Sequence, residues 1–115
     1  MSGFGRILYA TITFQELEEW LDNHTAMKII DLRNPSSYAS SHFKTAVNLP
    51  YEEMEDWFTD LPWGELLVFY CSRGSTSMMV CNRLSAAGYT VVNLAGGYTF
   101  YKGKYRETED EKRND

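Results

Sequence analysis

Residues 66–88 read LLVFYCSRGSTSMMVCNRLSAAG, and this stretch decides the fold. The first five residues, 66–70, are all hydrophobic, which is typical of a strand buried on both faces in a parallel sheet. A short loop with one glycine and several hydroxyl side chains follows. The loop opens into a helical pattern that ends at Gly88, since glycine is favoured just after the last turn of a helix. The stretch therefore predicts a central strand, a tight loop and a helix, with Cys71 between the strand and the loop.

The position of Cys71, between a strand end and a helix start, predicts a reactive thiol. In open α/β sheets, ligands bind at the carboxyl ends of the strands. Backbone N–H groups at a helix start attract anions, so they should stabilise the Cys71 thiolate and make it a better nucleophile. Gly74 allows the backbone a positive φ and a close approach to a bound group, and Ser75 and Thr76 can donate hydroxyl hydrogen bonds or cap the helix. A buried, inert cysteine in an unused fold is the alternative interpretation.

Composition limits the classes of protein to consider. The chain has 115 residues, of which 43% are hydrophobic and 23% charged, and its formal net charge is −5. It shows no basic stripe for nucleic acid, no run of about 18 apolar residues for a membrane span, and no signal-peptide pattern. Two distant cysteines do not make a disulfide framework, so we expect a reducing, cytoplasmic setting. We assign residues 1–105 to one domain and residues 106–115 to a charged, disordered tail.

Strand and helix patterns alternate along the rest of the chain. Thr13 and Glu16 fit a capping box at the start of a helix that runs to about Asn23, and Pro35 can begin a short helix after a strand. The strands that we expect cover 7–10, 27–32, 46–49, 66–70 and 90–94, and further helices or turns cover 51–61 and 98–104. This alternation predicts an α/β fold with a parallel sheet of about five strands and right-handed crossovers.

From about Ile12 to Tyr101, the order of these segments resembles the rhodanese homology domain. The segment IIDLRNPSSYASSH at 29–42 resembles the family's strand followed by D-x-R, x-P and Y-x-x-x-H, and AVNLP at 46–50 resembles its A-x-N-I-P strand. CSRGSTS at 71–77, GYTVVNLAGG at 88–97 and a following aromatic residue complete the order. The resemblance implies a small rhodanese-like domain with helices on both faces of the sheet and a six-residue active loop, here Cys71–Thr76.

The same resemblance implies a sulfurtransferase. The loop cysteine of the family accepts sulfane sulfur from a donor such as thiosulfate as a persulfide and passes it to a thiol, cyanide or protein acceptor. Thr76 resembles the loop end of the thiosulfate and mercaptopyruvate sulfurtransferases, where many single-domain members have arginine. Ser72 stands where many members have a basic residue, and Tyr101 where the family often has tryptophan. These departures concern the preferred donor more than the sulfur chemistry.

We assign Cys71 as the catalytic nucleophile. We expect the donor to be held by the rest of the loop and the helix start, namely Ser72, Arg73, Gly74, Ser75, Thr76 and Ser77. Arg73, the only cation of the loop, either binds the donor's oxyanion or is a solvated loop arginine. Asp31 and Arg33, at the end of a neighbouring strand, are supporting residues that either orient the loop or pair with each other. His42 and Cys81 are interpreted as structural, and no metal or organic cofactor is needed.

Two other functions stay open at this point. A binding module, or a sensor of redox state or persulfide, would use the same fold and cysteine without catalysis. A phosphatase of this fold would need a longer loop of the form C-x5-R, but the sixth residue after Cys71 is Ser77. The expected partners are a small sulfane-sulfur donor and, as a possible acceptor, a protein thiol, with neither nucleic acid nor membrane. The oligomeric state does not follow from these patterns.

Overall fold

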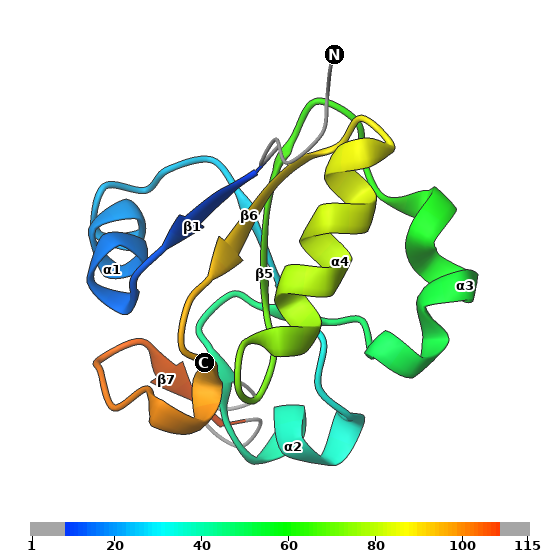
Figure 1. The fold of residues 1–115 in the computed structure, drawn as a ribbon. Coiled ribbons are helices and arrows are strands. Elements are labelled where there is room, and N and C mark those ends of the chain that lie inside the picture. The colour runs from blue at the N-terminus through cyan, green and yellow to red at the C-terminus, as the bar shows by residue number, and fades with distance from the viewer. Residues whose placement is uncertain (1–8, 109–115) are drawn as a thin grey trace.

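The computed structural model describes residues 9–108, and Figure 1 shows a sheet with helices on both sides. The main sheet has five strands in the order β1–β6–β5–β2–β4, and every neighbouring pair is parallel. The strands are β1 (Ala10–Ile12), β2 (Lys28–Asp31), β4 (Val47–Asn48), β5 (Leu66–Tyr70) and β6 (Thr90–Leu94). The predicted five-stranded parallel sheet is therefore confirmed, with β5 at its centre.

Helices and single 3-10 turns connect the strands. The helices are α1 (Phe14–Asp22), α2 (Pro35–Ser40), α3 (Met54–Trp57) and α4 (Ser75–Ala86), and the 3-10 turns are η1 (Tyr51–Glu53), η2 (Phe58–Asp60) and η3 (Tyr98–Phe100). In Figure 1, α3 and α4 lie on one side of the sheet and α1 lies on the other. Within residues 9–108, no helix is long and apolar enough to cross a membrane.

Successive residues of the central strand pack into two different hydrophobic cores. Phe69 belongs to the core that also holds Trp57 of α3 and Leu84 of α4, whereas Val68 belongs to the core that holds Leu17 of α1. Both strand residues are fully buried. Burial of both sheet faces explains why this strand is continuously apolar in the sequence, and the expected helices on both faces are confirmed.

Side-chain caps begin α1, as predicted, and α2. The Glu16 N–H donates to Thr13 Oγ1 at 3.1 Å, and the Thr13 N–H donates to Glu16 Oε1 at 2.9 Å, which completes the capping box of α1. Asn34 caps α2 through the Ser37 N–H at 2.8 Å, with Pro35 as the first residue of the helix. These local hydrogen bonds fix where each connection leaves the sheet.

Two element boundaries differ from the prediction. Strand β1 covers Ala10–Ile12 and so extends beyond Ala10, where the expected strand ends, because its register pairs Ala10 with Val92 and Ile12 with Leu94 of β6; residues 7 and 8 of the expected strand lie outside the described residues. The helix expected over 98–104 is only the turn η3. Tyr101 ends it with an extended backbone (φ −80°, ψ 130°) and is buried in the core below α1. Tertiary packing sets the ends of both elements, so the local sequence pattern alone does not predict them.

The predicted boundary between domain and tail, at residue 105, is too early. Arg106–Glu107 forms strand β7, which pairs antiparallel with β3 (His42–Phe43). The buried Glu107 carboxylate places Oε1 3.6 Å from Nε2 of the fully buried His42. This pairing joins segments that are distant in the sequence, so a charged composition alone did not reveal it. Residues 109–115 lie outside the described residues.

Candidate functional site

Cys71 follows strand β5 directly, at the carboxyl edge of the sheet. Its side chain is 5% exposed and lines a pocket of about 340 Å³, which we call the Cys71 pocket. The pocket walls come from strand ends, connecting loops and the start of α4: Leu32, Arg33, Asn34, Ser37, Tyr51, Glu52, Cys71, Ser72, Arg73, Ser75 and Thr76. The thiol therefore lies at the carboxyl edge of the sheet, where the sequence analysis expected a ligand.

Backbone N–H groups surround the Cys71 sulfur. The Gly74 N–H donates to Sγ at 3.1 Å and the Ser77 N–H donates at 3.3 Å. Gly74 has a φ of 99°, which only glycine adopts without strain, and this conformation turns the loop around the sulfur. Both donors lie at the start of the 12-residue helix α4, where the backbone carries a partial positive charge. The geometry therefore places two N–H donors and the positive end of the helix dipole at the sulfur.

The Ser77 side chain lies inside the molecule and is not part of the pocket wall. The residue is fully buried, and its hydroxyl lies 3.1 Å from the Gly74 carbonyl and 2.5 Å from Oδ1 of Asn93. Ser77 therefore ties the loop to strand β6, and only its N–H reaches the sulfur. Asn93 was missed by sequence reasoning, although a single polar residue in an apolar strand is a recognisable signal.

The remaining loop side chains line the pocket. Ser72, Arg73, Ser75 and Thr76 all lie on its wall, and their binding of a sulfur donor stays a prediction. The expected capping of α4 by Ser75 or Thr76 is wrong, because Gly74 is the N-cap and no side chain caps this helix. The absence of such a cap leaves these two hydroxyls available to a bound molecule.

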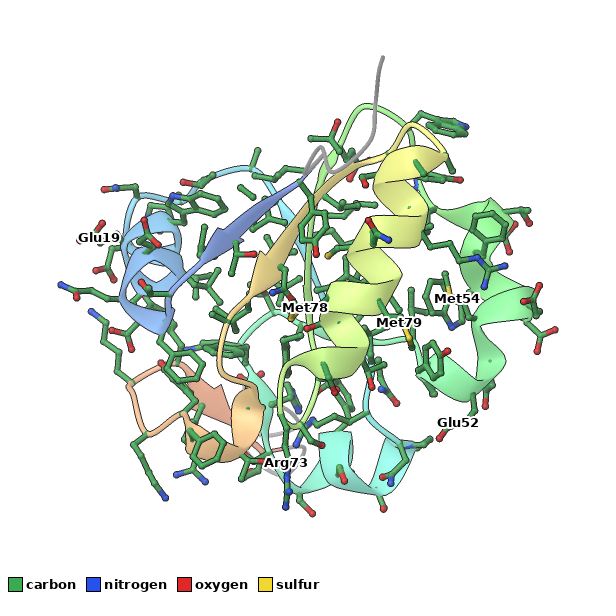
Figure 2. The ribbon with its side chains drawn as sticks, in the orientation of Figure 1. Glu19, Glu52, Met54, Arg73, Met78 and Met79 are labelled. Carbon is green, nitrogen blue, oxygen red and sulfur yellow. The ribbon has the colours of Figure 1, made fainter. Side chains whose placement is uncertain are left out.

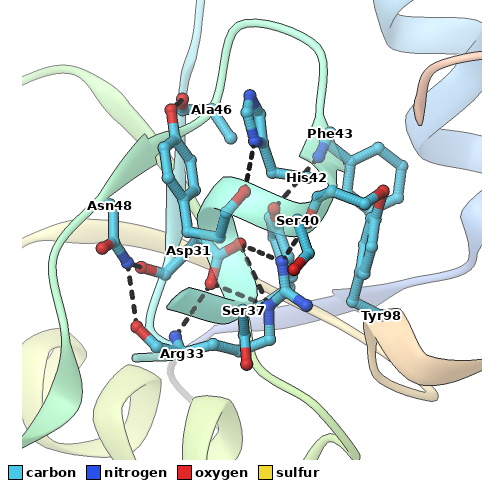
Figure 3. Close-up of polar contacts among 12 residues, drawn as sticks. Asp31, Arg33, Ser37, Ser40, His42, Phe43, Ala46, Asn48 and Tyr98 are labelled. Atoms are coloured by element: carbon cyan, nitrogen blue, oxygen red, sulfur yellow. Dashed lines mark hydrogen bonds and ion pairs between the residues drawn. The ribbon is translucent and has the colours of Figure 1, made fainter. Parts of the chain in front are cut away.

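Asp31 and Arg33 pair with each other (Figure 3). Arg33 donates from Nη2 to Asp31 Oδ2 at 2.7 Å and from Nε to Oδ1 at 3.0 Å. Its guanidinium carbon also lies 4.4 Å from the centroid of the Tyr98 ring. Burial acts to lower the pKa of Arg33, but hydrogen bonds to Asp31 and its charge raise that pKa above the ordinary value. Arg33 is therefore a fixed cation in the wall of the Cys71 pocket.

The pocket thus combines two guanidinium groups with the thiol. Arg73 is exposed at the rim, whereas Arg33 is held in place by Asp31. Sequence reasoning counted only the loop cation and treated Arg33 as a supporting residue. It also missed the other wall residues that lie outside the loop, namely Leu32, Asn34, Ser37, Tyr51 and Glu52. These residues reach the pocket only through the fold, so no local motif identifies them.

Turn η3 supports the loop that follows Cys71 through backbone hydrogen bonds. The Tyr98 N–H donates to the Cys71 carbonyl at 2.8 Å, and the Thr99 N–H donates to the Ser72 carbonyl at 3.0 Å. Gly97 precedes this turn with a φ of 77°, and a Cβ on it would collide with the backbone of Ser72 and Arg73. The Gly96-Gly97 pair therefore does more than end a strand, since Gly97 lets η3 approach the active loop.

Cys81, unlike Cys71, does not line the Cys71 pocket. It is fully buried in the core between the sheet and α4, and burial raises the pKa of its thiol to about 12. This agrees with its interpretation as a core residue. Among residues 9–108, no group of three or more His, Cys, Asp and Glu side chains could hold a metal ion.

Comparison with known proteins gives a consistent family. A family model described as the rhodanese-like domain matches residues 13–104. The chain is 27% identical over 93 residues to the putative sulfurtransferase YtwF of Bacillus subtilis, covering 81% of this chain and 90% of that protein. It is 36% identical over 70 residues to the thiosulfate sulfurtransferase PspE of Escherichia coli, covering 59% and 67%.

A longer relative and a solved structure complete this comparison. The chain is 31% identical over 91 residues to the probable adenylyltransferase/sulfurtransferase MoeZ of Mycobacterium tuberculosis, but it spans only 23% of the length of that protein. A rhodanese-like domain protein from Staphylococcus aureus superposes with a TM-score of 0.78 at 25% identity, covering 86% of this chain and 97% of that one. From the family model and this shared fold, the chain belongs to the rhodanese-like domain family, whose named relatives here are sulfurtransferases.

Proposed function

We propose that this protein is a sulfurtransferase that carries sulfane sulfur on Cys71 as a persulfide. The observation that supports this most is the pair of N–H donors, from Gly74 and Ser77, that converge on the Cys71 sulfur at the edge of an arginine-lined pocket. The named relatives support sulfur transfer as the general reaction, whereas the donor and acceptor of this chain are part of our proposal.

In the first step, the Cys71 thiolate attacks the outer sulfur of a donor such as thiosulfate. A bond forms between Sγ and that sulfur, and the sulfur–sulfur bond of thiosulfate breaks. Sulfite leaves with the electron pair, and Cys71 is left as Cys71–S–S⁻. Backbone N–H groups of the loop can then stabilise the terminal anionic sulfur. Arg33 and Arg73 favour binding of an anionic donor in the pocket.

In the second step, a nucleophilic acceptor attacks the terminal sulfur of the persulfide. The bond between Sγ and that sulfur breaks, and its electron pair returns to Cys71 as the thiolate. Cyanide would leave as thiocyanate, and a thiol would leave as a persulfide. The pocket volume of about 340 Å³ suits a small donor or the tip of a larger acceptor. Apart from the sulfur donor and the acceptor, both steps use only groups of this chain.

A steady-state assay with thiosulfate and cyanide tests this proposal. We expect thiocyanate to form over many turnovers, to disappear in Cys71→Ser, and to persist in Cys81→Ala, which should lose stability but keep activity. Circular dichroism would verify that each variant is folded. Full activity in Cys71→Ser would refute the assignment. Uptake of sulfur without turnover would instead favour the alternative, a persulfide-sensing or redox-sensing module.

A further inference from the structure

Beside the Cys71 pocket, an open groove runs between turn η1, helix α3 and helix α4. It consists of two hollows of about 290 and 210 Å³, and Tyr51, Met54 and Arg83 line both. Tyr51 also lines the Cys71 pocket, and Glu52 lines both that pocket and the smaller hollow. The groove, which we call the α3–α4 groove, therefore continues into the pocket that holds the reactive sulfur.

The first wall of the α3–α4 groove belongs to α4 and carries an exposed apolar side chain, Met79. Met79 of α4 lines the larger hollow and is 54% exposed. Figure 2 shows Met79 on the side of α4 that faces α3, where Met54 lies. Successive helix residues point about 100° apart, so the neighbouring Met78, which is 51% exposed, lies on another side of α4. Exposed methionines adapt their shape to a partner, and such apolar surface often marks a protein interaction site.

The second wall belongs to the acidic segment 51–60, of which Glu52 and Glu55 line the smaller hollow. Segment 51–60 contains no Lys, Arg or His, and all of its acidic residues are exposed: Glu52, Glu53, Glu55, Asp56 and Asp60. Arg83 pairs with one of them, Glu55, at 3.4 Å between Nη2 and Oε2. The Cys71 pocket, by contrast, contains Arg33 and Arg73. The surface therefore carries two guanidinium groups at the sulfur and, along the groove, the exposed carboxylates of segment 51–60, with Arg83 paired to one of them.

We infer that the α3–α4 groove docks a protein that exchanges sulfur with Cys71, an inference that rests on the function proposed above. The partner segment should place a cysteine in the cationic pocket, where a thiolate is attracted, and should extend along the groove. There it should present an apolar side chain to Met79 and Lys or Arg side chains to the acidic wall. The carboxylates along the groove would repel an acidic segment, so the expected partner is a basic, partly apolar cysteine-containing segment.

The transfer at this surface balances without an oxidant or a reductant. The thiolate of the partner cysteine attacks the terminal sulfur of the Cys71 persulfide, and a sulfur–sulfur bond forms on the partner. The bond between that sulfur and Cys71 Sγ breaks, and its electron pair remains on Sγ as a thiolate held by the Gly74 and Ser77 N–H groups. The partner then leaves as a persulfide, and Cys71 can accept sulfur again.

Transfer to two matched synthetic peptides tests this docking site. One peptide is rich in lysine and contains one leucine and one cysteine, and the other has glutamate in place of each lysine. We expect kcat/KM for the lysine peptide to exceed that for the glutamate peptide by about tenfold at low salt, with a smaller ratio at high salt. Equal rates for the two peptides at low salt would overturn the proposed charge selection.

Two pairs of matched variants locate the effect on the surface. Met79→Ser should lower the ratio of lysine-peptide transfer to cyanide transfer about fivefold, whereas Met78→Ser, one residue away on another face of α4, should not. Glu52→Lys should lower lysine-peptide transfer by a similar factor, whereas Glu19→Lys, on the distant helix α1, should not (Figure 2). Equal effects within either pair would contradict docking at the α3–α4 groove.

A binding measurement separates failure of this inference from failure of the proposed function. Fluorescence anisotropy of a labelled lysine peptide with the Cys71→Ser protein reports docking without any sulfur transfer. Saturable binding that Met79→Ser weakens would support docking at the α3–α4 groove. If, in addition, no sulfur is transferred to cyanide, that second result would refute only the proposed function. Sulfur transfer to cyanide with no peptide binding would overturn the groove alone. Self-association that Met79→Ser abolishes would assign the groove to a second copy of this chain and also overturn the inference.

Discussion

Arg33 and Arg73 both line the Cys71 pocket, but only Arg73 is free to follow a substrate. Arg33 is fixed by three side-chain hydrogen bonds to Asp31, whereas Arg73 is exposed at the rim. We predict that Arg73→Ala raises KM for thiosulfate about three- to tenfold, an effect limited by solvent screening. Arg73→Lys should recover part of the loss, because it restores charge without the forked geometry. Unchanged thiosulfate kinetics at low salt would make Arg73 a solvated loop residue.

Ser77 supports the sulfur indirectly, through its buried hydroxyl. Ser77→Ala would remove the hydroxyl that bonds Asn93 Oδ1, whereas the Gly74 carbonyl would keep the Met78 N–H as a donor at 3.3 Å. We predict a loss of about 1–3 kcal/mol in the free energy of unfolding, the usual penalty for a buried acceptor left without its donor. Ser85→Ala is the matched control in the same helix, because the Ser85 hydroxyl is bonded at the surface; it should change stability by less than about 0.5 kcal/mol. Equal urea midpoints for both variants would contradict this role.

At the scale of elements, turn η3 and the active loop are in backbone contact at Gly97. Gly97 and Gly64 both have a φ of 77°, but a Cβ would meet the loop backbone only at Gly97, since nothing lies within 4 Å at Gly64. Gly64→Ala should therefore cost about 1–2 kcal/mol for the backbone conformation alone. Gly97→Ala should cost more and should also lower sulfur transfer, because the loop must move. Thermal unfolding and the thiocyanate assay would measure both effects, and equal behaviour of the two variants would argue against this contact.

Elements whose signals are local could be predicted from the sequence. The capping box of Thr13 and Glu16 and the strand–loop–helix unit around Cys71 both lie within short stretches, and both are as expected. Strand β7 was missed because its only signal is its pairing with β3, far away in the chain. The site follows the same rule, since the loop residues were identified whereas Asn93, Tyr51 and Glu52 were not. The sheet order and the crossover connections bring Tyr51 and Glu52 to the pocket wall and Asn93 to the Ser77 hydroxyl.

At the scale of the whole molecule, the β3–β7 pair joins the end of the described chain to its first half. Glu107→Ala would remove the buried carboxylate beside His42, whereas Glu55→Ala would remove an exposed partner of Arg83. We predict that Glu107→Ala lowers the free energy of unfolding by about 2 kcal/mol more than Glu55→Ala, because exposed ion pairs contribute little. Urea denaturation of the two variants is the measurement. Equal losses would mean that the β3–β7 pair does not stabilise the domain.

The most direct test of the central claim is the intact mass of the protein after exposure to thiosulfate. We predict that the wild-type chain gains the mass of one sulfur atom, that peptide mapping places it on Cys71, and that cyanide removes it. Cys81→Ala should gain the same mass, and Cys71→Ser should gain none. A sulfur atom found on Cys81, or a folded wild-type protein that takes up no sulfur from thiosulfate or any other sulfane donor, would contradict the account.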